Sequence, residues 1–107
     1  MKIKAEVCAG VCGFCTTVQA SGDGPDVWVE AISDCPRVQD LAAELGALDA
    51  FQEVLSKPLA ETKLALLSAK YRLHATCPVP VGILKAIEAA AGLALPADCR
   101  VELARVE

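Results

Sequence analysis

The sequence is poor in aromatic residues, with one Trp, one Tyr and two Phe among 107 positions. Apolar residues still make up 54% of the chain, so we expect an ordered core of aliphatic side chains. No apolar run approaches the roughly 18–20 residues that a membrane-spanning helix requires. The segment Met1–Glu6 also lacks the apolar stretch of a secretory signal. We therefore expect a cytoplasmic protein without a membrane partner.

Concentrated positive charge is missing as well. The net charge is −4 and the basic residues are scattered along the chain. Proteins that bind nucleic acids usually carry a basic stripe. The nearest candidate here is the group Lys63, Lys70 and Arg72, which is typical of a solvated helix face. We expect no nucleic-acid partner.

The motifs of common enzymes are also absent. The chain has no Ser/His/Asp triad, no paired catalytic carboxylates, no Walker loop and no Gly-x-Gly-x-x-Gly sequence. His74 is the only histidine. These absences leave enzymatic activity open but favour a binding protein.

The beginning of the chain has the pattern of β-strands. Apolar residues alternate with polar ones, and later segments are rich in β-branched residues. Turns that contain glycine separate the segments. The predicted strands are Lys2–Val7, Cys15–Ala20 and Val27–Ile32.

The middle of the chain has helical spacing of its apolar residues. The first predicted helix starts near Pro36 and carries an apolar face of Val38, Leu41, Ala42, Leu45 and Leu48. Asp49–Leu55 is predicted to add another helical turn or two. Two further helices are predicted, one at Leu59–Leu73 and one that begins at Pro78 or Pro80 and has Gly92 after its last turn.

Alternation returns at the end of the chain, where Cys99–Val106 is predicted to be a strand that pairs with an early one. The element order is then β-β-β-α-α-α-β. Grouped strands followed by grouped helices are typical of an α+β protein with a small antiparallel sheet and helices packed on one face. With no visible linker, residues 1–107 are predicted to form a single domain.

Six cysteines are a high count for a cytoplasmic chain of this length. In a reducing compartment, such cysteines are more often metal ligands or redox groups than structural disulfides. Their positions are Cys8, Cys12, Cys15, Cys35, Cys77 and Cys99.

Cys35-Pro36 and Cys77-Pro78 share one local pattern, in which a cysteine ends an extended segment and a proline begins a helix. A helix N-terminus presents free backbone N–H groups and the positive end of the helix dipole. Both favour thiolate over thiol, and thiolate is the form that binds metals. Small apolar capping residues are the alternative interpretation.

Two further residues are candidate ligands. Cys12 lies between Gly10 and Gly13, which would let backbone amides approach a bound sulfide, although an ordinary hairpin turn has the same pattern. His74 precedes Cys77 with His-x-x-Cys spacing, which lets both side chains reach one metal. In the last turn of a helix, His74 would also be favoured by the helix dipole alone.

Cys12 and Cys15 also form a Cys-x-x-Cys pair, which together with His74 and Cys77 would make a Cys₃His zinc site. Cys35 in place of Cys15 is a second version of that site. Cys8 and Cys99 lie at strand ends and are interpreted as core residues or as a second thiol cluster.

Taken together, the layout resembles the iron–sulfur cluster scaffold proteins of the IscU/NifU type. The resemblance rests on the Cys12-Gly13 turn that leads into a strand, on Ser33–Pro36 before a helix, and on the His74/Cys77 pair before the last helix. It implies that Cys12, Cys35 and Cys77 are cluster ligands, with His74 or an exogenous group as the fourth. Segments around the same three cysteines also look like a small uncharacterised cysteine-containing family of anaerobes.

The sequence therefore predicts a metal-binding protein, with an iron–sulfur cluster as the first expectation. A zinc protein and a metal-free carrier of sulfur or a disulfide on Cys35 and Cys77 are the alternatives. The partners expected for such a protein are cluster or sulfur donors and acceptors, or a second copy of the chain.

Overall fold

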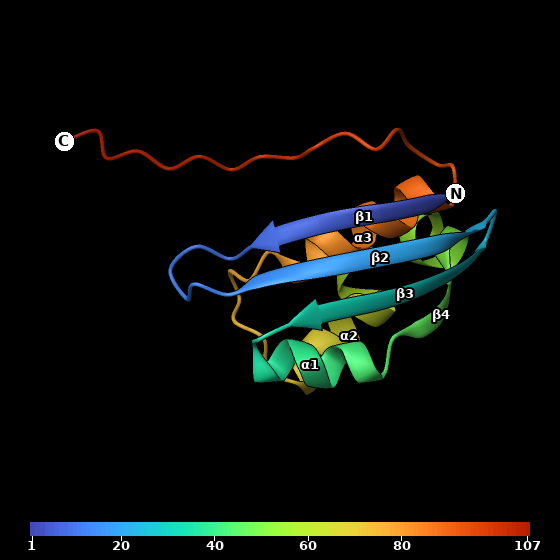
Figure 1. Ribbon diagram of the computed structural model, residues 1–107, viewed down its shortest axis with the longest axis horizontal. Helices are drawn as coiled ribbons and strands as arrows, with labels where there is room; N and C mark the ends of the chain where they lie inside the picture. Colours follow the sequence, from blue (N-terminus) through green and yellow to red (C-terminus); the bar gives the residue numbers. More distant parts are fainter.

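In the computed structural model, which describes all 107 residues, four strands form one antiparallel sheet in the order β1-β2-β3-β4 (Figure 1). Each strand pairs with the next along the chain, as expected for short turns between antiparallel strands. The first three predicted strands are confirmed. The strands are β1 Lys2–Cys8, β2 Cys15–Asp23, β3 Asp26–Ser33 and β4 Gly46–Asp49.

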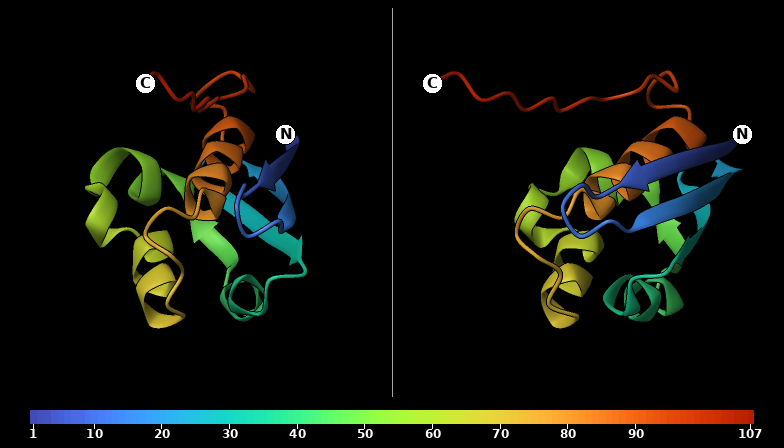
Figure 2. Two further views of the ribbon diagram at one scale, coloured as in Figure 1. Left: turned by 90° about the vertical axis from the view of Figure 1, so that its left-hand side faces the viewer. Right: turned by 60° about the vertical axis from the view of Figure 1, so that its left-hand side comes forward.

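The helices pack against this sheet, so the predicted small α+β fold is confirmed (Figure 2). α3 lies across β1 and β2, and α1 lies against β3. None of the helices has the length and apolar character needed to cross a bilayer. The helical segments are α1 Pro36–Ala43, the π-helical turn η1 Gln52–Ser56, the 3-10 turn η2 Leu59–Glu61, α2 Lys63–Lys70 and α3 Val79–Ala90.

The core lies between the helices and one face of the sheet. Val18, Val29 and their inward-facing neighbours are buried, whereas Trp28 and Glu30 on the opposite face are exposed. This alternation is the two-residue period of a half-buried sheet. From the helical side, the core is filled by aliphatic residues that include Leu41, Leu64, Ile83 and Ile87.

Glycine makes a close contact between α3 and the sheet possible. Gly82 lies against the side chain of Val7, and a Cβ atom at position 82 would overlap the Val7 Cγ2 atom. Only a residue without a side chain lets the helix approach β1 at this point. Gly82 therefore sets how α3 rests on the β1–β2 hairpin.

The first predicted helix was wrong in its second half. α1 ends at Ala43, and Gly46 has φ +61, a left-handed conformation that suits glycine and breaks the helix. Leu48, predicted to lie on the helical face, lies in β4 opposite Val27. The open edge of β3 offers hydrogen bonds that a longer helix would leave unused.

The final strand predicted near the end of the chain is not formed either. Gly92 (φ +79) closes α3 with a hydrogen bond from the Leu93 N–H to the Glu88 carbonyl, 3.0 Å long, which confirms its predicted position after the helix. The residues beyond form an extended tail without strand pairing, although Cys99–Val106 alternates as a strand would. The observed order is β-β-β-α-β-α-α, with η1 and η2 before α2.

The helix predicted at Leu59–Leu73 is observed as the shorter α2, Lys63–Lys70, because the extended backbone of Thr62 interrupts it. The Thr62 side chain caps α2 by accepting from the Ala65 N–H at 3.1 Å. The buried Glu53 carboxylate accepts from two more free amides of the first turn, those of Lys63 (2.9 Å) and Leu64 (3.4 Å).

We predict that Glu53→Ala lowers the free energy of unfolding by about 1–3 kcal/mol, because two helix amides lose their acceptor. Urea titration followed by circular dichroism measures this. Glu61→Ala is the matched control, since that exposed carboxylate makes no hydrogen bond or ion pair in the structure. Equal stability of the two variants would contradict the capping role.

A polar cluster joins the end of α1 to the end of α2. Glu44 accepts hydrogen bonds from Lys70 (2.7 Å) and from the Tyr71 hydroxyl (2.6 Å). Mainly the Lys70 bond, and then the Tyr71 bond, hold the pKa of the Glu44 carboxyl below its usual value. A lowered carboxyl pKa contributes stability above the ordinary pKa, and that contribution is lost as the pH falls through the lowered value.

We therefore predict that Glu44→Gln unfolds at lower urea concentration than the wild type at neutral pH. The difference should shrink as the pH falls through the lowered pKa of Glu44, because both proteins then carry a neutral group at this position. Asp40→Asn changes the same charge on an exposed residue of α1 and is the control. A difference that persists unchanged in acid would show that the charge of Glu44 is not the cause.

Candidate thiol site

Two cysteines close the β1–β2 hairpin. Cys8 lies directly opposite Cys15 in the strand register, and their sulfur atoms form a disulfide with the Cα atoms 4.1 Å apart. The Ala9 N–H donates to the Phe14 carbonyl at 3.0 Å just beyond this pair. Cys15, predicted as a possible zinc ligand, is therefore bonded to Cys8 in this structure.

Cys12 lies at the tip of the same hairpin. Gly10 (φ +83) and Gly13 (φ +77) both take left-handed conformations, and the Gly13 N–H donates to the Gly10 carbonyl at 2.9 Å. This tight turn exposes the free thiol of Cys12. The glycine turn predicted around Cys12 is confirmed.

Cys35 is the N-cap residue of α1 and ends the extended segment before the helix, as the Cys35-Pro36 pattern predicts. Its thiol is free and half-buried, and its side chain makes no capping hydrogen bond. Its backbone N–H donates to the Ser33 hydroxyl at 3.2 Å, and that hydroxyl also accepts from the Thr16 hydroxyl at 2.8 Å. These bonds tie the start of α1 to the first residues of β2.

Cys77 precedes α3, whose N-cap is Pro78. Its thiol is free and half-buried, and its backbone N–H donates to the His74 carbonyl at 3.0 Å. His74 is exposed and lies in the loop between α2 and α3. It was predicted in the last turn of a helix, but α2 already ends at Lys70.

These segments meet at one end of the sheet. The β1–β2 turn, the junction of β3 with α1 and the start of α3 all lie at the left of Figure 1. The Arg37 guanidinium in α1 donates to the Arg72 carbonyl at 2.7 Å, which joins α1 to the loop that leads to Cys77. The contact of Gly82 with Val7 joins the start of α3 back to the hairpin. Five cysteines thus belong to neighbouring segments.

The side chains at this end do not converge on one point. Nowhere in the structure do three His, Cys, Asp or Glu side chains lie close enough together to hold one metal ion. The predicted ligands Cys12, Cys35, Cys77 and His74 occupy adjoining segments rather than a formed coordination shell. Cys99, the sixth cysteine, lies exposed in the tail.

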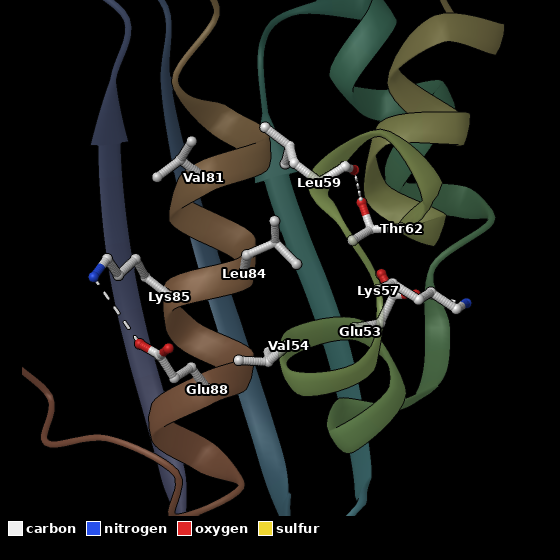
Figure 3. A pocket seen from close by; sticks show the side chains of 9 residues that line it. All are labelled: Glu53, Val54, Lys57, Leu59, Thr62, Val81, Leu84, Lys85 and Glu88. Atoms are coloured by element: carbon white, nitrogen blue, oxygen red, sulfur yellow. Dashed lines mark hydrogen bonds and ion pairs between the residues drawn. The ribbon is translucent and has the colours of Figure 1, made fainter.

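A pocket of about 250 Å³ lies between α3 and the η1–η2 segment (Figure 3). Its charged groups are paired with one another: Lys57 with Glu53 at 3.3 Å, and Lys85 with Glu88 at 4.0 Å. No cysteine or histidine lines it. The pocket therefore offers no unpaired reactive group, and the thiol end is the stronger candidate.

The Cys8–Cys15 pair is the feature that sequence reasoning missed. Both residues flank a glycine turn at the ends of adjoining antiparallel strands, a pattern that places them opposite each other when the register is counted outward from the turn. Cys8 and Cys15, seven positions apart, were interpreted separately, Cys8 as a core residue or part of a second thiol cluster and Cys15 as a zinc ligand. A cytoplasmic setting argues against a disulfide.

Comparison with known proteins gives one match. No curated protein and no solved structure matches the chain. The model of a family of unknown function, DUF6951, matches residues 3–103, which includes all six cysteines. The chain therefore belongs to the DUF6951 family.

Proposed function

We propose that this protein binds a metal centre through the thiolates of Cys12, Cys35 and Cys77, with an iron–sulfur cluster as the first candidate. The observation that carries the proposal is that the three free thiols come from neighbouring segments at one end of the sheet. His74, or a ligand from outside the chain, takes the fourth position. Soft thiolate ligands select zinc and iron–sulfur clusters over hard cations.

Local electrostatics supports this use of Cys35 and Cys77. Each precedes the first turn of a helix, where free N–H groups and the positive end of the dipole favour a negative charge. Both side chains also pack against the core, which limits their motion. Two ligands are thereby held by rigid elements.

Of the three proposed thiolate ligands, Cys12 is the one that would have to move toward the other two. No atom of another segment lies within 4 Å of where a Cβ at Gly10 or Gly13 would be, so neither glycine is packed against another segment on that side. Closure of this turn toward Cys35 and Cys77 would complete a three-thiolate site. The cost of ordering the turn is repaid by metal–thiolate bonds, because metal binding and folding of a site are coupled.

An iron–sulfur cluster at this end would also imply the kind of partner and the location of the protein. The order of the ligand segments resembles that of the IscU/NifU scaffolds, and a cluster held at an exposed end would suit transfer to or from donor and acceptor proteins. Cysteine ligands stay reduced in a reducing compartment, where the Cys8–Cys15 bond would be open as well, so the proposal implies a cytoplasmic location.

A zinc site is the alternative within the same class. It would use Cys12, His74 and Cys77 with either Cys15 or Cys35. The Cys15 version requires reduction of the Cys8–Cys15 disulfide before zinc binds.

The disulfide itself favours a second, metal-free candidate, which is thiol exchange within the hairpin. The Cys12 thiolate would attack one sulfur of the Cys8–Cys15 bond, forming a new S–S bond to that cysteine and releasing the other as a thiolate. No electrons are gained or lost in this exchange. Cys12 lies exposed between the two bonded residues, which is the observation behind this alternative.

We predict that Cys35→Ser and Cys77→Ser each abolish the iron and acid-labile sulfide of protein purified without oxygen, because two thiolates cannot retain the cluster. Cys99→Ser is the matched control, since that cysteine lies in the exposed tail. Iron analysis and the visible absorption band give the readout. Full iron content in Cys35→Ser would remove this residue from the site.

We predict that Cys15→Ser keeps its iron and sulfide, because Cys15 is not in the cluster ligand set. Loss of bound zinc in Cys15→Ser, with zinc retained in Cys35→Ser, would replace the cluster by the zinc site.

Mass mapping of the disulfides in metal-free protein tests the thiol-exchange candidate. A mixture of Cys8–Cys12, Cys12–Cys15 and Cys8–Cys15 bonds supports exchange, and a Cys8–Cys15 bond alone opposes it.

A further inference from the structure

Strand β1 has an open edge. It is the first strand in the sheet order, so its outer backbone N–H and C=O groups have no partner strand. Its inward-facing residues Ile3, Ala5 and Val7 are only half-buried, although Val18 beside them on β2 is fully buried. An open edge of this kind accepts another strand.

The tail has the composition of a strand but no partner in its own chain. Val101 and Leu103 are 87% and 93% exposed. No backbone hydrogen bond joins any residue after Ala97 to the rest of the molecule. The family match extends to residue 103, so the tail is part of the family's domain rather than an appendage to it.

We propose that the tail of one chain pairs as an antiparallel fifth strand with β1 of a second copy. Two copies would exchange tails about a two-fold axis, so that each sheet gains one strand. The occupant of the β1 edge is thus residues 99–104 of an identical chain. This proposal does not depend on the proposed metal centre.

Side-chain complementarity supports one register. If Ile3 lies opposite Leu103, then Ala5 lies opposite Val101 on the core-facing side. On the other side, Lys4 then lies opposite Glu102, and Glu6 lies opposite Arg100.

In the structure, Lys4 and Glu6 already form an ion pair at 3.2 Å along β1, and Arg100 and Glu102 form one at 3.5 Å along the tail. Antiparallel pairing brings these two pairs together with opposite charges facing, an arrangement that stabilises adjacent strands. Shifting the register by two residues in either direction places like charges opposite each other.

The chain's own β1 is a poorer partner for the tail. The tail and β1 run in the same direction (Figure 1), so pairing within one chain would be parallel, whereas the rest of the sheet is antiparallel. The parallel register with Val101 beside Ala5 places Arg100 beside Lys4, whereas the one with Val101 beside Val7 places Arg100 beside Glu6. The parallel direction, rather than the charges, is therefore what disfavours pairing within one chain.

The segment that leads to the tail is too short to allow antiparallel pairing of the tail with β1 of the same chain. Residues 93–98 would have to run the length of β1 before the tail turned back. Six residues span roughly 20 Å at full extension, which is about the length of a seven-residue strand. No residues would remain for the turn.

The first test is the mass of the protein in solution, measured by light scattering and sedimentation in the presence of reductant and chelator. These additives remove dimers joined by disulfides or by metal. The full chain should have twice the 11.1 kDa mass of one copy, and a chain ending at Ala97 should be a folded monomer. A monomeric full chain, or a truncated chain that still dimerises, would overturn the proposal.

The second test reverses the order of charges without changing composition. Arg100→Glu with Glu102→Arg should weaken dimerisation about tenfold or more, because two attractive pairs at each tail become repulsive. Adding Lys4→Glu with Glu6→Lys should restore it.

The matched control is Arg105→Glu with Glu107→Arg, which reverses an equivalent ion pair beyond the paired residues and should leave the dimer unchanged. Failure of the four-residue variant to recover dimerisation would overturn the antiparallel register. If the Arg100→Glu/Glu102→Arg variant is a monomer and its tail is protected from hydrogen exchange, the tail pairs with β1 of its own chain instead.

Discussion

The packing of α3 across β1 and β2 is the contact on which the rest of the structure depends. A four-stranded sheet with one covered face needs apolar helices over that face, and α3 covers the β1–β2 half with Ile83 and Ile87. Gly82 allows the close approach to Val7. The same helix carries Cys77 to the hairpin end of the sheet and starts the tail at the other end. Both the candidate thiol site and the proposed exchange of tails therefore follow from how this helix is placed.

The thiol end combines two half-buried free thiols with one exposed free thiol. Cys35 and Cys77 are held next to helix N-termini by hydrogen bonds of their own backbone N–H groups. Cys12, by contrast, lies in an open glycine turn, and Cys8 and Cys15 are bonded to each other just behind it. The proposed binding of one metal centre by all three thiols requires that this turn closes toward Cys35 and Cys77. The redox state of the hairpin decides how many further thiolates that end can offer.

Much of the fold could be predicted because local signals and tertiary packing agree. The strands β1 to β3 follow the two-residue alternation, and Gly92 lies after α3 as its conformational freedom suggests. β4 could not be predicted, because Leu45 and Leu48 fit a helical face and only the open edge of β3 favours a strand. The positions of Cys35 and Cys77 next to helix starts were predicted for the same local reason, while the Cys8–Cys15 bond depends on register and so was missed.

The most direct test of the central claim is the iron and acid-labile sulfide content of the wild-type protein, purified without oxygen and with its absorption spectrum recorded. The account predicts iron and sulfide in stoichiometric amounts and a broad visible band. Zinc without sulfide would replace the cluster by the Cys₃His site. Protein without any metal in repeated preparations would contradict the metal centre and leave thiol exchange at the hairpin as the function of these cysteines.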